Sequence, residues 1–402
     1  AYSCNPYKGS EAGNGWNLSF QLAQQGHQVW CFTSSRNRED IDKYLADNEV
    51  TNLEMVFIPM PKWADRFYEK SQMGVYYHYI VWQSRAGKKA RKLHKEVNFD
   101  MVHHITLASP QMGSGMWRLN IPFVYGPLGG GQFAPEAFKK YFHGYWKQET
   151  RRAMVSNLLM KYNPNTRKAL KAADVVLVTN PETHNFLKSE VKHKLEYFLD
   201  TSLPEDFFAE SMPQRPARKE IKLLWVGRIY ARKGLPLVLE GLSKVDPSIA
   251  YKLTIVGDGP MGAMVPGWIK EFDLEDKVDW IGRIPWNEVK KAYLEHDVFI
   301  FCSLRESFGS QLLESMAYGL PIITLNHQGA GYFVPDEASI KVSVESPEQS
   351  AQEIAAAVAL LSKDPDKRYQ MGQVGFDFAR EQVWSKKTRH LGEKYDRLLN
   401  PA

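Results

Sequence analysis

Two glutamates, Glu306 and Glu314, bracket a turn whose residues could bind a sugar and a phosphate. The apolar run 297–302 before the turn is typical of a buried strand, and residues 312–317 after it are typical of a helix that ends at 319–321. Carboxylates bind sugar hydroxyls, whereas the unpaired N–H groups and the positive dipole end of a helix favour an anion. The spacing therefore indicates a site for a sugar joined to a phosphate, and two solvated acids on an ordinary turn are the alternative.

This stretch resembles the Glu-x7-Glu element of retaining glycosyltransferases of the GT-B fold, family 4 in particular. The resemblance implies that Glu306 binds hydroxyls of the donor sugar and that Glu314 binds the nucleotide ribose. It also implies that Phe308, Gly309 and Ser310 contact the donor sugar and diphosphate through their backbone.

A basic loop follows the strand expected at 222–226. Residues 227–234 are similar to the family's Gly-Arg-x4-Lys-Gly element, which makes Gly227 a donor-binding residue. The family spacing selects Arg228 and Lys233 as the cations that pair with the donor diphosphate. Cations at that place would stabilise the charge that develops on the leaving phosphate. A solvated basic loop is the alternative.

The first part of the chain carries a glycine-rich loop and a histidine pair. Residues 9–16 resemble the family's first loop, which implies that Gly9 and Gly13 lie near the donor. The resemblance also implies a histidine near the donor sugar's C6 hydroxyl, for which His104 is the first choice and His103 the alternate. A glycine-rich helix entry and a structural histidine are the respective alternatives.

Two further turns bear on the nucleotide. The resemblance implies that the backbone of Ile284 binds the base, with uracil as the family default. The sequence 257–262 spells Gly-x-Gly-x-x-Gly after a strand, as in dinucleotide-binding proteins. Pro260 removes one N–H group that a pyrophosphate would use, and the candidate acid Asp279 lies inside the next strand. A tight turn beneath the nucleotide site is therefore favoured.

Metal use and the acceptor side depend on two short sequences. The pair Asp364 and Asp366 has the Asp-x-Asp spacing of metal-dependent transferases, but it sits where a turn is expected. We therefore predict metal-independent transfer, with no cofactor beyond the nucleotide-sugar substrate. By resemblance, the glycine-rich sequence 126–132 shapes the acceptor side.

The chain has 402 residues, of which 44% are hydrophobic and 24% charged, which suggests two or three globular domains. Its three cysteines, Cys4, Cys31 and Cys302, fit neither a disulfide framework nor a zinc site, which favours a reducing cytoplasm. No apolar run reaches the ~18 residues that span a bilayer, and no secretory signal is present. The strand expected before the first glycine-rich loop is nearly absent, so we expect the natural sequence to begin a few residues earlier.

The formal net charge of +5 is unevenly distributed. Between residues 137 and 171 nine lysines and arginines accompany a single acid, Glu149, with aromatic residues interleaved. The segment 63–95 has the same character. Such segments suit an anionic membrane surface, and solvated basic helix faces are the alternative. No nucleic-acid-binding motif is present, so we expect no nucleic-acid partner.

Candidate strands alternate with helices along the whole chain, at 27–33, 53–59, 100–105, 122–125, 174–179, 222–226, 252–256, 278–281, 298–302 and 321–325. The pattern favours doubly wound α/β architecture. The resemblance implies the GT-B fold, with two Rossmann-like domains facing each other across a cleft. The expected domains are 1–200 on the acceptor side, 201–383 on the donor side and a helix, 384–402, that crosses back to the first.

The family resemblance thus implies a retaining hexosyltransferase that transfers a sugar, with glucose from UDP-glucose as the first choice. The expected acceptor is lipid-linked or a polysaccharide, in envelope, exopolysaccharide or glycolipid assembly. We expect a cytoplasmic protein with peripheral contact at the inner face of the cytoplasmic membrane. The alternatives are a non-catalytic nucleotide-sugar-binding scaffold and an NAD-dependent oxidoreductase.

Overall fold

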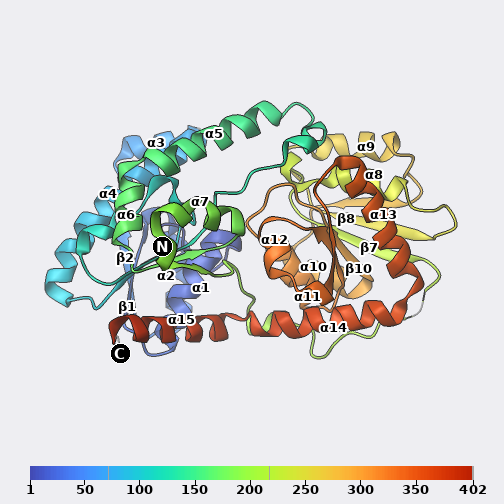
Figure 1. Ribbon diagram of the computed structural model, residues 1–402. Coiled ribbons are helices and arrows are strands. Elements are labelled where there is room, and N and C mark those ends of the chain that lie inside the picture. The colour runs from blue at the N-terminus through green and yellow to red at the C-terminus, as the bar shows by residue number, and fades with distance from the viewer. Residues whose placement is uncertain (71, 217, 401–402) are drawn as a thin grey trace. The chain divides into compact units, whose positions relative to one another are not determined.

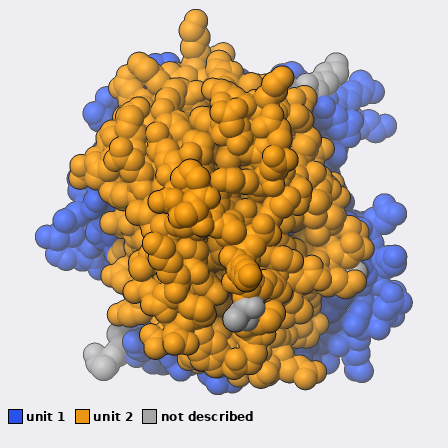
Figure 2. Space-filling model, turned by 90° about the vertical axis from the view of Figure 1, so that its right-hand side faces the viewer, with its two compact units in different colours: residues 1–131, 153–202, 384–402 blue, residues 132–152, 203–383 orange. Residues whose placement is uncertain are grey.

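The computed structural model describes residues 1–70, 72–216 and 218–400, which form two compact units. The first unit contains residues 1–131, 153–202 and 384–402, and the second contains residues 132–152 and 203–383 (Figures 1 and 2). The divisions near 202 and 383 are close to the expected domain limits. Residues 132–152, expected in the first domain, group instead with the second unit.

The second unit is built on a six-stranded parallel sheet with the order β12-β11-β10-β7-β8-β9. Its strands are β7 (Ile221–Val226), β8 (Tyr251–Val256), β9 (Val278–Gly282), β10 (Val298–Phe301), β11 (Ile322–Leu325) and β12 (Ser339–Val342). The order of connection reverses between β7 and β10. In open parallel sheets, ligands bind outside the carboxyl ends of the strands at such a reversal.

Helices flank this sheet: α8 (Leu235–Ser243), α9 (Val265–Glu271), α10 (Trp286–Glu295), α11 (Ser310–Met316), α12 (Gln328–Phe333), α13 (Pro347–Lys363) and α14 (Pro365–Glu381). The central strands β7, β10 and β11 are almost wholly buried because helices cover both faces of a parallel sheet, whereas the edge strands β9 and β12 are partly exposed. Asp364 caps α14, since its side chain accepts a hydrogen bond of 2.8 Å from the N–H of Lys367. The Asp-Pro-Asp sequence is therefore a helix start with a one-residue connection, where the sequence predicted a loop.

The first unit contains two parallel sheets (Figure 1). One pairs β1 (Val29–Ser34) with β2 (Leu53–Ile58), and the other has the order β3 (Val102–His104), β4 (Phe123–Leu128), β5 (Val175–Val178) and β6 (Leu195–Tyr197). The helices of this unit are α1 (Ser10–Gln24), α2 (Arg38–Asp47), α3 (Lys62–Lys70), α4 (Gln72–Val97), α6 (Pro164–Ala172), α7 (Pro181–Val191) and α15 (Trp384–Leu399). Helix α5 (Trp146–Tyr162) begins in the second unit and ends in the first.

The first residues of the chain lie between the two sheets of the first unit. The amino group of Ala1 donates a 3.1 Å hydrogen bond to the carbonyl of Phe32, and the N–H of Tyr2 donates one of 3.3 Å to the carbonyl of Thr106. A cavity of about 380 Å³ lies between β1 and β3, lined mainly by apolar side chains. The two sheets are thus bridged at one end by Ala1 and Tyr2 and separated along their length by this cavity.

Candidate functional site

Two loops meet at the carboxyl ends of β7 and β10, where the strand order of the second unit reverses. The carbonyl of Arg232 accepts hydrogen bonds from the N–H of Leu304 at 2.8 Å, the N–H of Arg305 at 3.2 Å and the hydroxyl of Ser303 at 3.0 Å. The loop that carries the basic sequence is therefore fixed to the loop that carries Glu306.

Glu306 is the centre of this arrangement. Its carboxylate accepts a hydrogen bond from the ammonium of Lys233 and one of 2.7 Å from Nη1 of Arg232. The Lys233 side chain is only 7% exposed, and its ammonium lies 4.8 Å from the centre of the Phe301 ring. The structure thus brings together Glu306 and Lys233, two residues that the sequence selected.

The charge of Glu306 is set by these neighbours. Burial by itself raises the pKa of a carboxyl group, but Lys233 and Arg232 outweigh burial and lower the pKa of Glu306 to about 2. The group is therefore a carboxylate at neutral pH, suited to accept hydrogen bonds from hydroxyls. Two cations around one carboxylate also leave a positive charge that favours an anionic group such as a diphosphate.

The arginine that contacts Glu306 is Arg232, whereas the spacing had selected Arg228. Arg228 is exposed, and its guanidinium lies 5.0 Å from the centre of the Tyr230 ring. Arg232 instead contacts the carboxylate of Glu306. The role of Arg228 at the diphosphate stays a prediction, and Arg232 joins the candidate residues.

Glu314 lies inside α11 with a partner of its own. The hydroxyl of Tyr293 donates a 2.9 Å hydrogen bond to its carboxylate, and burial raises the pKa of Glu314. Phe308 is fully buried, Gly309 has a φ of +101°, which favours glycine, and Ser310 begins the helix. The proposed contacts of these residues with the donor stay predictions.

The turn after β8 is closed on the chain itself. The N–H of Ile229 donates to the carbonyl of Asp258 at 3.1 Å, and the N–H of Met261 donates to the carbonyl of Ile229 at 3.2 Å. Gly227 and Gly257 also lie in close contact, since a Cβ on Gly257 would collide with the carbonyl of Gly227. These contacts favour the tight turn over a dinucleotide loop. Ile284 follows β9 and is half-buried.

Both histidines at the end of β3 are bonded within the first unit. His104 contacts the hydroxyl of Tyr79 at 3.1 Å and that of Ser114 at 2.9 Å, and burial lowers its pKa to about 3. His103 contacts the hydroxyl of Tyr395 at 2.6 Å and the carbonyl of Gly126 at 2.7 Å, and burial lowers its pKa to about 4. With both ring nitrogens engaged, each histidine has the contacts of a structural residue, and a role at the donor stays a prediction.

The glycine-rich loop at the start of α1 contains a half-buried acid that the sequence did not single out. Glu11 accepts a hydrogen bond from the N–H of Ala108, whose carbonyl accepts one of 2.9 Å from the N–H of Gly129. Burial raises the pKa of Glu11 to about 7. A Cβ on Gly13 would collide with the carbonyl of Lys8, whereas one on Gly9 would meet open space. The start of α1 and the glycine-rich loop after β4 thus meet at Ala108.

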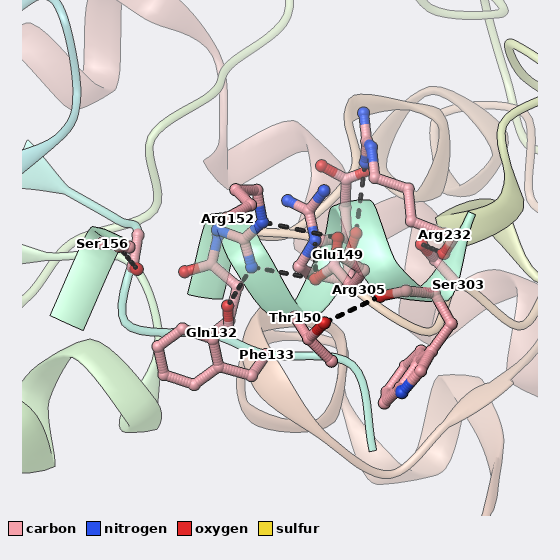
Figure 3. A network of polar contacts seen from close by, with 12 residues as sticks. Gln132, Phe133, Glu149, Thr150, Arg152, Ser156, Arg232, Ser303 and Arg305 are labelled. Carbon is pink, nitrogen blue, oxygen red and sulfur yellow. Dashed lines mark hydrogen bonds and ion pairs between the residues drawn. The ribbon is translucent and has the colours of Figure 1, made fainter. Parts of the chain in front are cut away.

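Two other contacts of the Glu306 loop were missed by sequence reasoning. Gln328 accepts a 2.7 Å hydrogen bond from the N–H of Glu306, and Glu149 forms an ion pair of 2.8 Å with Arg305 (Figure 3). The one available signal was that Glu149 is the single acid of a long basic segment. Within the described residues, no group of three or more His, Cys, Asp or Glu side chains is arranged to hold a metal ion.

Comparison with known proteins identifies the domain that contains Glu306. Residues 207–377 match the family described as glycosyl transferases group 1. The second unit is a group 1 glycosyl transferase domain. The amylovoran biosynthesis glycosyltransferase AmsK of Erwinia amylovora is 31% identical over 150 residues, which are 36% of this chain and 36% of AmsK. The aligned part thus spans about a third of the length of this curated relative.

Solved structures extend the comparison of this glycosyl transferase domain to the full fold. WaaG, a glycosyltransferase involved in lipopolysaccharide biosynthesis, matches with a TM-score of 0.61 and 15% identity, over 100% of this chain and 99% of WaaG. Alr3699/HepE of Anabaena, solved with UDP-glucose, matches with a TM-score of 0.59 and 12% identity, over 98% of each chain. The predicted GT-B fold is confirmed.

Proposed function

We propose that this protein is a retaining glycosyltransferase that transfers a sugar from a nucleotide-sugar donor to a lipid-linked or polysaccharide acceptor. The observation that carries the proposal is the contact of Glu306 with Lys233 and Arg232 at the strand-order reversal of a group 1 glycosyl transferase domain. A carboxylate for sugar hydroxyls and cations for a diphosphate are then adjacent.

These residues also suggest how the reaction proceeds. As the bond between sugar and diphosphate breaks, negative charge grows on the leaving phosphate, and fixed cations near it lower the barrier. Lys233 and Arg232 are held in place by Glu306, so they need little rearrangement when the donor binds. We propose that these cations, with Arg228, stabilise the leaving phosphate as a divalent ion does in other transferases. Transfer is therefore metal-independent. Retention, with the donor phosphate accepting the proton of the acceptor, follows the family resemblance.

UDP-glucose is the donor we propose first. The Anabaena protein of similar fold was solved with UDP-glucose, which supports this choice for the present chain. Names of similar proteins refer to amylovoran and lipopolysaccharide biosynthesis, which supports a role in envelope or exopolysaccharide assembly.

A panel of nucleotide sugars tests this function, with a chelator present and no acceptor. We expect heat of binding and slow release of nucleoside diphosphate from one donor, with UDP-glucose as the first candidate. Binding without release would favour a non-catalytic scaffold. Loss of all turnover on chelation, restored by a divalent ion, would contradict metal-independent transfer. If no nucleotide sugar of the panel binds, the proposal that this protein uses one of them as its donor is wrong.

We further propose that the first unit contacts an anionic membrane at its periphery. The described residues contain no helix that is long and apolar enough to cross a membrane. Exposed apolar side chains instead stand on α3, α4 and α5, namely Trp63, Phe67, Tyr76, Tyr77, Ile80, Met154, Val155, Leu158 and Tyr162. Apolar side chains among basic ones suit the boundary between headgroups and acyl chains, where a lipid-linked acceptor is presented.

A further inference from the structure

Residues 132–152, here called the strap, leave the first unit in sequence but pack within the second. Phe138 and Phe142 of the strap are buried in the core around the six-stranded sheet. Lys140 and Tyr141 both contact the carboxylate of Glu240 on α8, each at 3.0 Å. The strap is therefore an integral part of the unit that carries Glu306.

The end of the strap contacts the residue next to Glu306. The carboxylate of Glu149 lies 2.8 Å from Nε of Arg305 and 2.9 Å from Nη2 of Arg152, and the residue is 8% exposed (Figure 3). Arg152 also donates a 3.3 Å hydrogen bond to the carbonyl of Gln132, which ties the end of the strap to its beginning. Glu149 thus neutralises Arg305 in a nearly buried place.

The beginning of the strap is also linked to Glu306, by hydrogen bonds through Gln328. The carbonyl of Phe133 accepts a 3.0 Å hydrogen bond from the side chain of Gln328, whose oxygen accepts one of 2.7 Å from the N–H of Glu306. The strap therefore holds the Glu306 loop through Arg305 on one side and through Gln328 on the other.

We propose that Glu149 is a positioning residue for Glu306, acting through Arg305; the inference rests on the proposed function. Glu306 already has two cations, Arg232 and Lys233. Arg305, the residue next to it, would be a third cation if it were unpaired. By holding Arg305, Glu149 leaves the Glu306 carboxylate with the two cations that the donor diphosphate would use and keeps its backbone in place.

The substitution Glu149→Gln tests this role. The side chain keeps its size and loses its charge, so Arg305 is released to compete for Glu306. We expect the kcat of donor hydrolysis to fall by roughly 10- to 100-fold, the cost of a small misplacement of a reacting group. The affinity for the nucleoside diphosphate should change by less than about threefold, since Arg232 and Lys233 remain. An equal loss in kcat and in nucleotide affinity would overturn the proposal.

Two matched variants distinguish a positioning role of Glu149 from a general loss of packing of the strap. Glu240→Gln removes the other anchor of the strap without touching Arg305, and we expect it to leave kcat within about threefold. In an Arg305→Gln background, Glu149→Gln should have little additional effect, because Glu149 acts through Arg305. A loss in Glu240→Gln as large as in Glu149→Gln, or full additivity with Arg305→Gln, would overturn the proposal.

Hydrogen exchange tests the same contact without any turnover. In Glu149→Gln we expect amides of residues 303–309 to exchange roughly tenfold faster, with the strands of the sheet unchanged. Unchanged exchange in this loop would overturn the proposal. If the wild type turns over no donor, the proposed function fails, whereas exchange still decides whether Glu149 holds the loop.

Discussion

Glu306 and Glu314 have different surroundings, and the difference leads to the first prediction. Glu306 organises two cations and would contact the reacting sugar, whereas Glu314 is bonded to Tyr293 and would contact the ribose. We expect Glu306→Ala to lower kcat for donor hydrolysis by roughly 100-fold or more, and Glu314→Ala mainly to weaken nucleotide binding. Steady-state kinetics with calorimetry checks both variants. Equal and mild losses would contradict the assignment.

Glu11 gives a prediction about pH at the same scale. Its pKa of about 7 in the folded protein is above its ordinary value of 4.5 because the carboxyl group is buried. Its contribution to stability is therefore fully present below pH 4.5 and is lost as the pH rises through 7. Glu11→Gln removes this titration and can keep the hydrogen bond from Ala108. We expect the variant to gain up to ~3 kcal/mol over the wild type between pH 4.5 and pH 8.

Thermal unfolding at the two pH values measures this gain. Glu39→Gln, a change at an exposed residue of α2, serves as the control. If the wild type and Glu11→Gln differ by the same free energy at pH 4.5 and at pH 8, Glu11 does not titrate as described.

The sequence could predict residues whose role follows from local spacing. Lys233 and Glu306 lie in the loops that follow the neighbouring strands β7 and β10, so the two strands bring them to one edge of the sheet. Arg232 could not be chosen over Arg228, because the orientation of a side chain on a loop depends on the loop it packs against. Gln328 and Glu149 were missed because their contacts with the Glu306 loop join residues far apart in sequence.

At the scale of elements, the buried strands were the easiest to predict. Every candidate strand overlaps an observed one, since parallel strands are continuous apolar runs. The short edge strands β6 and β12 were missed, because Leu195–Tyr197 and Ser339–Val342 are partly exposed and mix polar with apolar residues. The strap was expected in the first domain but packs in the second unit. The local sequence of an aromatic and basic segment does not indicate which core its aromatic residues enter.

Helix α15 carries a prediction at this scale. Lys387 donates hydrogen bonds to the carbonyls of Leu199 and Thr201, and burial lowers its pKa to about 7 from an ordinary value of 10.5. Between these values the unfolded chain binds more protons than the folded one, so folding becomes more favourable as the pH rises. Relative to Lys387→Met, the wild type should gain up to ~3 kcal/mol between pH 7 and pH 9.5.

Urea unfolding at pH 7 and pH 9.5 measures this difference. Lys386→Met, at the neighbouring exposed position of the same helix, is the control. A constant difference between the wild type and Lys387→Met at both pH values would mean that Lys387 titrates normally.

At the scale of the whole molecule, each unit gathers its candidate residues at the carboxyl ends of parallel strands. In the second unit these are the loops of Glu306 and Lys233, and in the first they are the loops after β3 and β4, which meet the start of α1 at Ala108. The two loop clusters differ in charge, since Arg232 and Lys233 contact Glu306 in the second, whereas burial raises the pKa of Glu11 in the first to about 7.

The last prediction concerns the surface that would bring this molecule to its acceptor. On α5, exposed apolar and basic residues share one stripe within about 120° of the helix circumference at 100° per residue: Lys147, Arg151, Met154, Val155, Leu158, Lys161 and Tyr162. Glu149 lies on the opposite side. Each basic residue near an anionic surface contributes ~1 kcal/mol, so the three on this stripe would strengthen binding by roughly 100-fold.

We expect the protein to float with anionic liposomes at low salt, and to be released at high salt because salt screens charges at the surface. Met154→Asp and Leu158→Asp should each weaken flotation by placing a carboxylate against anionic headgroups. Leu360→Asp, at an exposed apolar residue of α13 in the second unit, should leave it unchanged. If the protein does not float at low salt, or if all three variants float equally, α5 is not the membrane-binding surface and its stripe is a solvated helix face.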